Sequence, residues 1–254
     1  MRVTILGSGT SAGVPTLGCR CAVCRSSNPR NKRMRVSAYL ETGGQRILID
    51  CGPDFRTQAL HNGISDIDAL LVTHTHADHV NGLDDLRSFN MVHKHAIPVY
   101  GSAEWLGELR VRFAYCFLPA LPGGGIPELN LHTVSPGQSF RIGDVEVLPL
   151  EIFHGTTPIL GFRIGDFGFI TDISSAPEAT RNALRGVKKL VTGALRWDPH
   201  PTHMSVGEAV AFAQETGAQE TWFIHMNHDL DHDATNALLP PGIRLAYDGL
   251  SFVV

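Results

Sequence analysis

The chain has 254 residues, with 21 Lys and Arg against 25 Asp and Glu, and it contains 13 His and five Cys. Its 43% hydrophobic content and mean hydropathy near zero, without an apolar run approaching the roughly 20 residues that span a bilayer, exclude an integral membrane protein. A net charge of −4 without a stripe of Lys and Arg argues against nonspecific binding of nucleic acid.

The first residues, 1–7, follow a strand pattern and lack the apolar segment and small-residue cleavage site of a secretory signal. We therefore expect a cytoplasmic protein. In that reducing compartment, five cysteines serve as free thiols or metal ligands more often than as disulfides.

Short runs of β-branched and other apolar residues recur along the chain and predict strands. Most of the predicted helices fall between groups of strands, and the last one begins with a capping box formed by Ser205 and Glu208. This order indicates two sheets packed face to face with helices outside. The predicted strands are Val3–Leu6, Arg46–Asp50, Ala69–Thr73, Val145–Leu150, Leu160–Ile164, Phe167–Thr171, Leu190–Thr192, Thr221–His225 and Leu250–Val254. The predicted helices are Phe55–Asn62, His79–Phe89, Ala103–Phe113, Pro177–Leu184 and Ser205–Glu215.

Four potential metal ligands lie in the sequence HTHADH at residues 74–79, directly after a predicted strand. In an extended segment, His74 and His76 project to the same side and can bind one ion. Asp78 and His79 follow as the chain turns into a helix, so we expect them to point toward a second ion.

This segment resembles the H-x-H-x-D-H motif of the metallo-β-lactamase superfamily, which implies an α/β fold with a four-layer αββα sandwich. The superfamily completes its site with a His, an Asp and a His; the matching candidates, in that order, are His154, Asp172 and His225, each at the C-terminal end of an apolar run. The resemblance implies that His74, His76 and His154 hold one ion, that Asp78, His79 and His225 hold the other, and that Asp172 bridges them.

Two divalent ions in such a site lie roughly 3.5–4 Å apart and generate hydroxide near neutral pH. With two carboxylates and a bridging hydroxide the site keeps a charge of about +1, which favours anionic phosphate esters. Imidazole ligands suit Zn, whereas carboxylates also admit Mn or Fe, so the choice between Zn and Mn stays open.

A second cluster, Cys19, Cys21 and Cys24, has C-x-C-x-x-C spacing in a loop at about residues 15–30. Three thiolates this close can share one ion, and tetrahedral zinc takes a fourth ligand, for which His228 is the best candidate. We therefore expect a structural zinc site beside the active site. Because residues on both sides of the Pro- and Gly-rich segment 121–127 contribute to these sites, we interpret that segment as a flexible loop and the whole of 1–254 as one domain.

The cysteine loop and the His-x-x-His pair resemble, over nearly the whole chain, the phosphoribosyl cyclic phosphate phosphodiesterases of phosphonate degradation. The shared segments include GVP at 13–15, LP at 239–240 and YDG at 247–249. This family implies a general acid on a His before a helix, and His203 matches it, with His200 as the rival. A helix that begins after Ser205 also favours phosphate nearby. The candidate catalytic residues are thus Asp78 and His203.

The predicted function is a dinuclear metal-dependent phosphodiesterase that hydrolyses a small, cyclic or linear phosphodiester by attack of a metal-bridging hydroxide. We expect neither nucleic acid nor membrane as a partner, and a homodimer stays open. We also expect Asp50 to support a ligand histidine through a hydrogen bond.

Three alternatives remain. A tRNA 3′-processing endonuclease shares the motifs, but the chain lacks its Lys- and Arg-rich arm; the short basic run 30–35 is either a phosphate-binding edge or a solvated loop. A thiolester or lactam hydrolase is less favoured, because the positive charge of the site and the family resemblance both point to a phosphate substrate. A non-catalytic cofactor-biosynthesis protein of the same fold is disfavoured by the complete ligand set.

Overall fold

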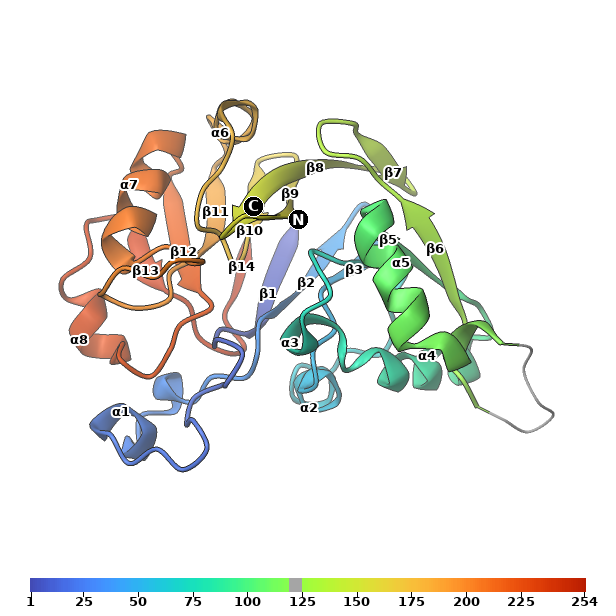
Figure 1. Cartoon of the computed structure of the whole chain (residues 1–254), viewed down its shortest axis with the longest axis horizontal. Helices are drawn as coiled ribbons and strands as arrows, with labels where there is room; N and C mark the ends of the chain where they lie inside the picture. The colour runs from blue at the N-terminus through green and yellow to red at the C-terminus, as the bar shows by residue number, and fades with distance from the viewer. Residues whose placement is uncertain (119–124) are drawn as a thin grey trace.

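The computed structural model describes residues 1–118 and 125–254; residues 121–124 of the predicted flexible loop lie outside that part. In the described part, two seven-stranded sheets pack face to face with helices on both outer faces (Figure 1). The predicted four-layer αββα sandwich of the α/β class is confirmed. No helix of the described residues is long and apolar enough to cross a membrane.

The first sheet has the strand order β14-β1-β2-β3-β4-β5-β6. Its strands from β14 to β3 pair antiparallel and those from β3 to β6 pair parallel. These strands are β1 (Arg2–Gly7), β2 (Ser37–Thr42), β3 (Gln45–Ile49), β4 (Ala69–Leu71), β5 (Ile97–Gly101), β6 (Leu129–Thr133) and β14 (Ser251–Val253).

The second sheet repeats this plan in the order β13-β12-β11-β10-β9-β8-β7. Here β7 to β10 pair antiparallel and β10 to β13 pair parallel. The strands are β7 (Phe140–Ile142), β8 (Val145–His154), β9 (Thr157–Ile164), β10 (Phe167–Ile170), β11 (Lys189–Gly193), β12 (Glu220–Ile224) and β13 (Ile243–Leu245).

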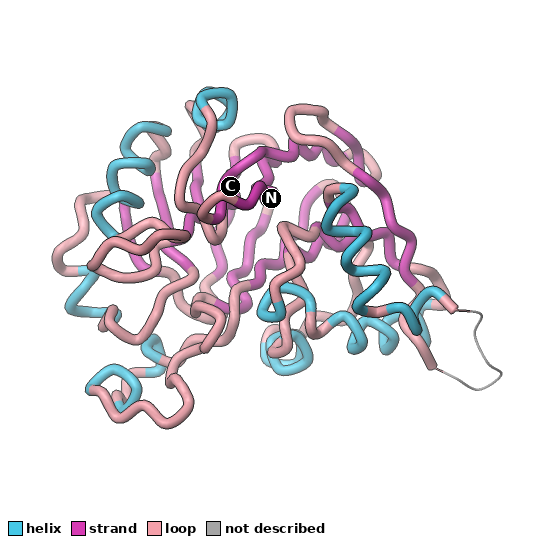
Figure 2. Tube along the Cα trace, viewed as in Figure 1, coloured by secondary structure: helices cyan, strands magenta, loops and turns pink. Residues whose placement is uncertain are grey.

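Figure 2 shows helices on the two outer sides of the strands. The α-helices are α1 (Ala22–Arg25), α2 (Phe55–His61), α3 (Ala77–Val80), α4 (Arg87–His93), α5 (Ala103–Arg112), α6 (Glu178–Leu184), α7 (Val206–Thr216) and α8 (His232–Asn236). Residues 1–118 and 125–254 also form three short 3-10 helices, η1 (Pro29–Asn31), η2 (Leu83–Leu86) and η3 (Ala114–Phe117).

Three apolar cores hold the layers together, because each sheet buries both of its faces. Ile49, Phe162 and Trp222 belong to the core between the sheets. A second core packs helices α6 and α7 against the outer face of the second sheet, and a third packs α2 and α5 against the outer face of the first. These buried cores hold the two sheets in place. The loops at the ends of the strands carry the candidate metal ligands.

The single helix predicted over residues 79–89 is wrong. The structure divides it into the end of α3, η2 and the start of α4. The break contains Gly82, where a Cβ would overlap the carbonyl oxygen of Gly52. This backbone-to-backbone approach brings the segment against the loop after β3.

Candidate metal centres

The ends of several strands place the predicted ligands at one edge of the sandwich. His74 and His76 follow β4 in extended backbone, and Asp78 and His79 lie in α3, which begins immediately after His76. Asp172 follows β10 and His225 follows β12. The carboxyl ends of parallel strands meet at one edge, which explains how ligands distant in the sequence converge.

Three residues of this edge adopt the left-handed backbone that L-residues rarely take. They are Asp50 (φ 58°), Asp172 (φ 51°) and His225 (φ 57°), each at the end of a strand. Such positions cost on the order of 1–3 kcal/mol and persist where the surroundings enforce them, often at functional sites. The sharp turn at each position redirects its side chain as the chain leaves the sheet.

One candidate ion position is formed by Asp78, His79, Asp172 and His225, whose ligand atoms lie within 4.8 Å of one another. Nε2 of His79 lies 3.3 Å from Asp78 and 3.4 Å from Asp172. Nε2 of His225 lies 3.2 Å from Asp172 and 3.5 Å from Asp78. These are the residues that the sequence assigned to the second ion, together with the bridging Asp172.

A neighbouring group joins His154, Asp172 and His203, again with ligand atoms within 4.8 Å. The ring of His76 lies 4.5 Å from that of His74 and 5.2 Å from that of His154, centroid to centroid. Nε2 of His74 lies 3.9 Å from Oδ2 of Asp172. Asp172 therefore contacts both sets of ligands, as a bridging residue must.

The chemistry of these donors fits a pair of cations. The Nε2 atoms of His74, His79 and His225 are buried and have no hydrogen-bond partner among the described residues. A buried polar atom without a partner is costly, so the site is built for a group that accepts lone pairs. Imidazole and carboxylate donors together suit Zn or Mn.

The charges of the cluster reinforce this interpretation. Burial opposes ionisation of Asp172 and Asp78, yet the neighbouring imidazoles hold both carboxyl pKa values well below their usual range. Burial would lower the pKa of His79, but Asp172, Asp50 and Asp78 raise it well above its usual range. The carboxylates thus attract positive charge to the position where a metal ion would lie.

Hydrogen bonds behind the ligands fix which imidazole nitrogen faces the site. Nδ1 of His154 donates to the backbone carbonyls of Asp172 and Thr202 at 3.1 and 2.9 Å, which leaves Nε2 as its lone-pair nitrogen. Nδ1 of His74 lies 3.0 Å from Oγ1 of Thr73, whose hydroxyl donates to Asp50. Thr73 was not recognised from the sequence, because it reads there as an ordinary strand residue.

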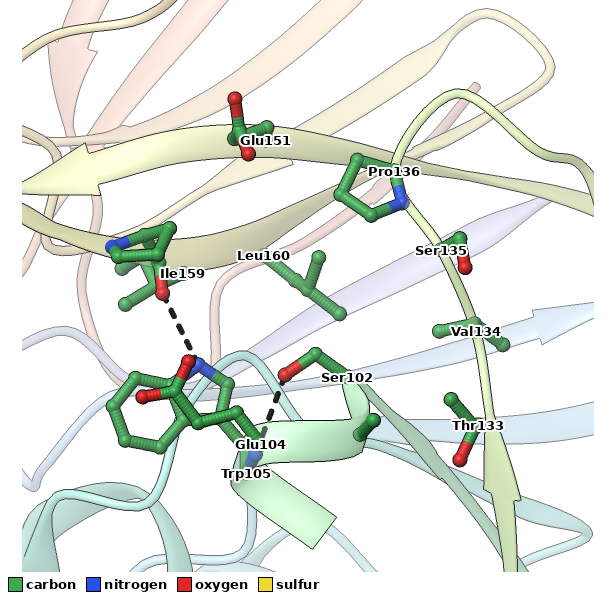
Figure 3. Close-up of a pocket in the computed structure, with 12 residues that line it drawn as sticks. Ser102, Glu104, Trp105, Thr133, Val134, Ser135, Pro136, Glu151, Ile159 and Leu160 are labelled. Carbon is green, nitrogen blue, oxygen red and sulfur yellow. Dashed lines mark hydrogen bonds between the residues drawn. The ribbon is translucent and has the colours of Figure 1, made fainter.

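Trp105 is a second neighbour that the sequence did not reveal. Its ring lies 6.2 Å from that of His74, and its Nε1 donates to the carbonyl of Pro158 at 3.2 Å. A cavity of about 280 Å³ lies beside this bond. Figure 3 shows the bond and the side chains of Leu160 and Val134, which also line the cavity. Trp105 therefore separates the ligand cluster from that cavity.

The structure distinguishes the two candidate proton donors. The ring of His203 stacks on that of His225 at 4.7 Å and lies 4.5 Å from that of His154. His200 lies one ring further out, 5.2 Å from His203, and contacts Thr202 through Nδ1. His203 thus lies inside the ligand cluster and His200 lies beside it.

The cysteine loop and the loop after β12 come together as expected. The ligand atoms of Cys19, Cys21, Cys24 and His228 lie within 4.8 Å of one another, with Nδ1 of His228 at 3.4 Å from Cys19 and 3.3 Å from Cys21. The backbone N–H of Cys24, and then His228, lower the pKa of the Cys21 thiol to about 6. A Cys3His set with a thiolate-favouring position fits zinc.

Three of the four cations of the basic run 30–35 make internal contacts, so most of the run is not a solvated loop. Arg33 is buried and donates to the carbonyls of Asn227 and Leu230, while Lys32 donates to the carbonyl of Cys24. Arg35 pairs with Asp54. The contacts of Lys32 and Arg33 hold the cysteine loop against the loop that carries His225 and His228.

The fold, the ordered ligands and the cysteine loop agree with comparisons to known proteins. A family model described as a beta-lactamase superfamily domain matches residues 45–226, and the chain belongs to this superfamily. A solved structure of a diphosphatase from the PhnP family superposes with a TM-score of 0.92 at 42% identity, covering 99% of this chain and 97% of that one. The resemblance drawn from the sequence is confirmed.

Two curated relatives extend the comparison. An octanoyltransferase from Porphyromonas gingivalis is 42% identical over 257 residues, which cover 100% of this chain and 52% of that protein. A ribonuclease Z from Methanopyrus kandleri is 32% identical over 139 residues, covering 54% of this chain and 46% of that protein. The chain spans about half the length of the curated relatives it matches. The chain therefore shares the metallo-β-lactamase fold of known hydrolases and has a candidate dinuclear metal site.

Proposed function

We propose that the chain is a metal-dependent phosphodiesterase that hydrolyses a small, linear or cyclic phosphodiester. The observation that carries this proposal is the shared position of Asp172, which contacts ligands of both candidate ion positions. The likeness to a diphosphatase at 42% identity supports phosphate chemistry.

Each group of site residues has its own role in the proposed reaction. Two divalent ions, held by the seven His and Asp ligands, would activate water and offset charge on the phosphate oxygens. Asp78 and Asp172 supply the negative charge that retains them. His203 lies beside His154 and His225, where it can donate a proton to the leaving oxygen. Burial, followed by the charge of His225, lowers the pKa of His203 to about 3. A bound phosphate anion beside the ring would raise this pKa toward the protonated form.

The second metal position has a different role in this proposal. We assign Cys19, Cys21, Cys24 and His228 a structural zinc, because this set is closed by four protein ligands and leaves no position for substrate. The zinc would hold the N-terminal loop to the segment that follows β12. It therefore supports His225 without taking part in the reaction.

A tRNA 3′-processing endonuclease is the second candidate function, favoured by the match to ribonuclease Z. Against it, most of the short basic run is occupied by internal contacts. The octanoyltransferase is about twice as long as this chain, so its activity does not carry over to this chain. The cluster of imidazoles and carboxylates in the described residues suits hydrolysis instead. The set of seven ligands and His203 also disfavours a non-catalytic cofactor-biosynthesis protein.

The test is a substrate screen of the metal-loaded protein with ribose cyclic phosphates, cyclic nucleotides, linear diesters and a tRNA precursor. The proposal expects turnover of a small diester and none of the tRNA precursor. Cleavage of tRNA alone would favour the nuclease. We further propose a cytoplasmic location, no nucleic acid or membrane partner, and leave a homodimer open to sizing measurements.

A further inference from the structure

A cavity of about 600 Å³ lies between α8, β13 and the 3-10 helix η1. Its volume is that of a typical small-molecule site. Figure 1 shows α8 and β13 together at the outer end of the second sheet. None of the residues that line the cavity belongs to either group of active-site ligands or to the cysteine cluster.

Two arginines and several hydrogen-bond donors line this cavity together with apolar residues. Arg30 and Arg244 line it, and neither forms a salt bridge within the described residues. The guanidinium of Arg30 lies 4.7 Å over the ring of Tyr247, which holds it in place. The one carboxylate in the lining, Asp233, already accepts a hydrogen bond from Asn28 at 2.8 Å.

A buried histidine completes the wall. His232 is 3% exposed, and its Nδ1 has no hydrogen-bond partner among residues 1–118 and 125–254. The backbone of His232 is fixed from both sides, because its N–H donates to Asn31 and its carbonyl accepts from Asn236. The wall is therefore built by specific contacts.

Arg30 also differs from the other cations of its own segment. Lys32, Arg33 and Arg35 all make internal contacts, whereas Arg30 alone faces this cavity. A planar guanidinium binds phosphate in bidentate fashion. We propose that the cavity is a second anion site, which binds the phosphate group of a small phosphorylated molecule between Arg30 and Arg244.

Such a ligand would connect η1, which follows the cysteine loop, to β13 at the edge of the second sheet. Leu239 and Pro240, in the shared LP segment, and Leu245 supply apolar walls for the remainder of the molecule.

The test is calorimetric titration of the metal-loaded protein with inorganic phosphate and with phenyl phosphate, at ionic strength held constant with chloride. We expect two phosphate sites per chain, one at the metal centre and one in the cavity. Arg244→Gln should weaken the cavity site about tenfold or more, as loss of a charge-assisted hydrogen bond does. The inhibition constant of phosphate against diester hydrolysis should stay unchanged.

Arg56→Gln is the matched control, because it removes the same charge from an exposed position on α2. Arg30→Gln is a second probe of the cavity, with folding of each variant checked by its melting temperature. Phosphate binding that neither Arg244→Gln nor Arg30→Gln weakens, or equal weakening by Arg56→Gln, would overturn the proposal. Because the readout is binding, its failure is distinct from failure of the proposed phosphodiesterase activity.

Discussion

Nδ1 of His79 lies 2.7 Å from Oδ2 of Asp50, and neither side chain is exposed to solvent. Asp50 also accepts hydrogen bonds from the backbone N–H and the hydroxyl of Thr73, and that hydroxyl lies 3.0 Å from Nδ1 of His74. One buried carboxylate thus orients a ligand of each proposed ion. The hydrogen bond that the sequence led us to expect from Asp50 is present.

Asp50→Asn should lower metal affinity or activity by about 10- to 100-fold, the usual cost of losing a hydrogen bond behind a metal ligand. The carboxylate accepts from the Thr73 backbone N–H at Oδ1, and from the Thr73 hydroxyl and His79 at Oδ2. An amide has a single acceptor oxygen, so one of these two positions loses its acceptor. Metal content and hydrolysis rate measure the effect. Asp166→Asn, which changes an exposed carboxylate paired with Lys188, is the control. Wild-type metal content and rate in Asp50→Asn would refute this role.

His203→Ala should reduce the hydrolysis rate in a way that depends on the leaving group. General acid catalysis is worth about 10²- to 10⁴-fold, so a diester with an alkoxide leaving group should lose that factor. Bis(p-nitrophenyl) phosphate, whose leaving group needs no proton, should lose much less. His200→Ala, one ring further from the ligands, should show no such dependence. An equal loss on both substrates would assign His203 a role other than proton donation.

Cys21→Ala should remove one zinc per chain and lower the melting temperature, while the active-site metals stay bound. The reason is that Cys21 and His228 close the cysteine cluster across the two loops. Metal analysis and thermal unfolding check this outcome. Cys116→Ala, a buried cysteine away from the cluster, should keep its zinc. An unchanged zinc content in Cys21→Ala would contradict the structural-zinc assignment.

Stability should fall between pH 6.5 and 4 in part because of His232. Burial, followed by Arg30 and Arg33, lowers the pKa of His232 to about 4, while Asp233 and Asp231 oppose the shift. In this window the unfolded chain binds a proton that the folded chain does not, so the free energy of unfolding falls as pH falls. Above pH 6.5 neutral His232 costs the fold nothing. As the pH falls to about 4, its resistance to protonation lowers the free energy of unfolding by roughly 3 kcal/mol.

His232→Gln should therefore show a shallower decline of stability below pH 6.5 than the wild type in urea unfolding. His61→Gln, which changes an exposed histidine, should keep the wild-type slope. The comparison uses slopes because either substitution can change stability at every pH. Identical slopes in His232→Gln and the wild type would show that His232 is protonated at no cost to the fold.

Much of the fold could be predicted from local patterns, but not all of it. The long strand β8 and the helix α7 carry clear signals, and α7 has its capping box of Ser205 and Glu208. Five strands were missed: β2, β5, β6, β7 and β13. A proline interrupts the β pattern of β5, and β7 and β13 have only three residues each. Their pairing with neighbouring strands is a tertiary effect that no local pattern contains.

Part of the candidate site could likewise be predicted from the sequence, and part could not. The spacing of His74 and His76 predicts them as metal ligands. Asp172 and His225 are predicted from the order of the later candidate ligands along the chain. The neighbours Thr73 and Trp105 could not be identified, because their roles depend on contacts across the fold. The tight approach of Gly52 to the backbone of Asp78 was equally invisible in the sequence.

The most direct test is metal titration of the chelator-treated protein, with hydrolysis of bis(p-nitrophenyl) phosphate followed against metal content. We predict that activity with Zn or Mn appears as two ions fill the active site, beyond the one in the cysteine loop, and that His76→Ala abolishes it. A wild-type protein with both active-site ions bound and no turnover with either metal would contradict the account.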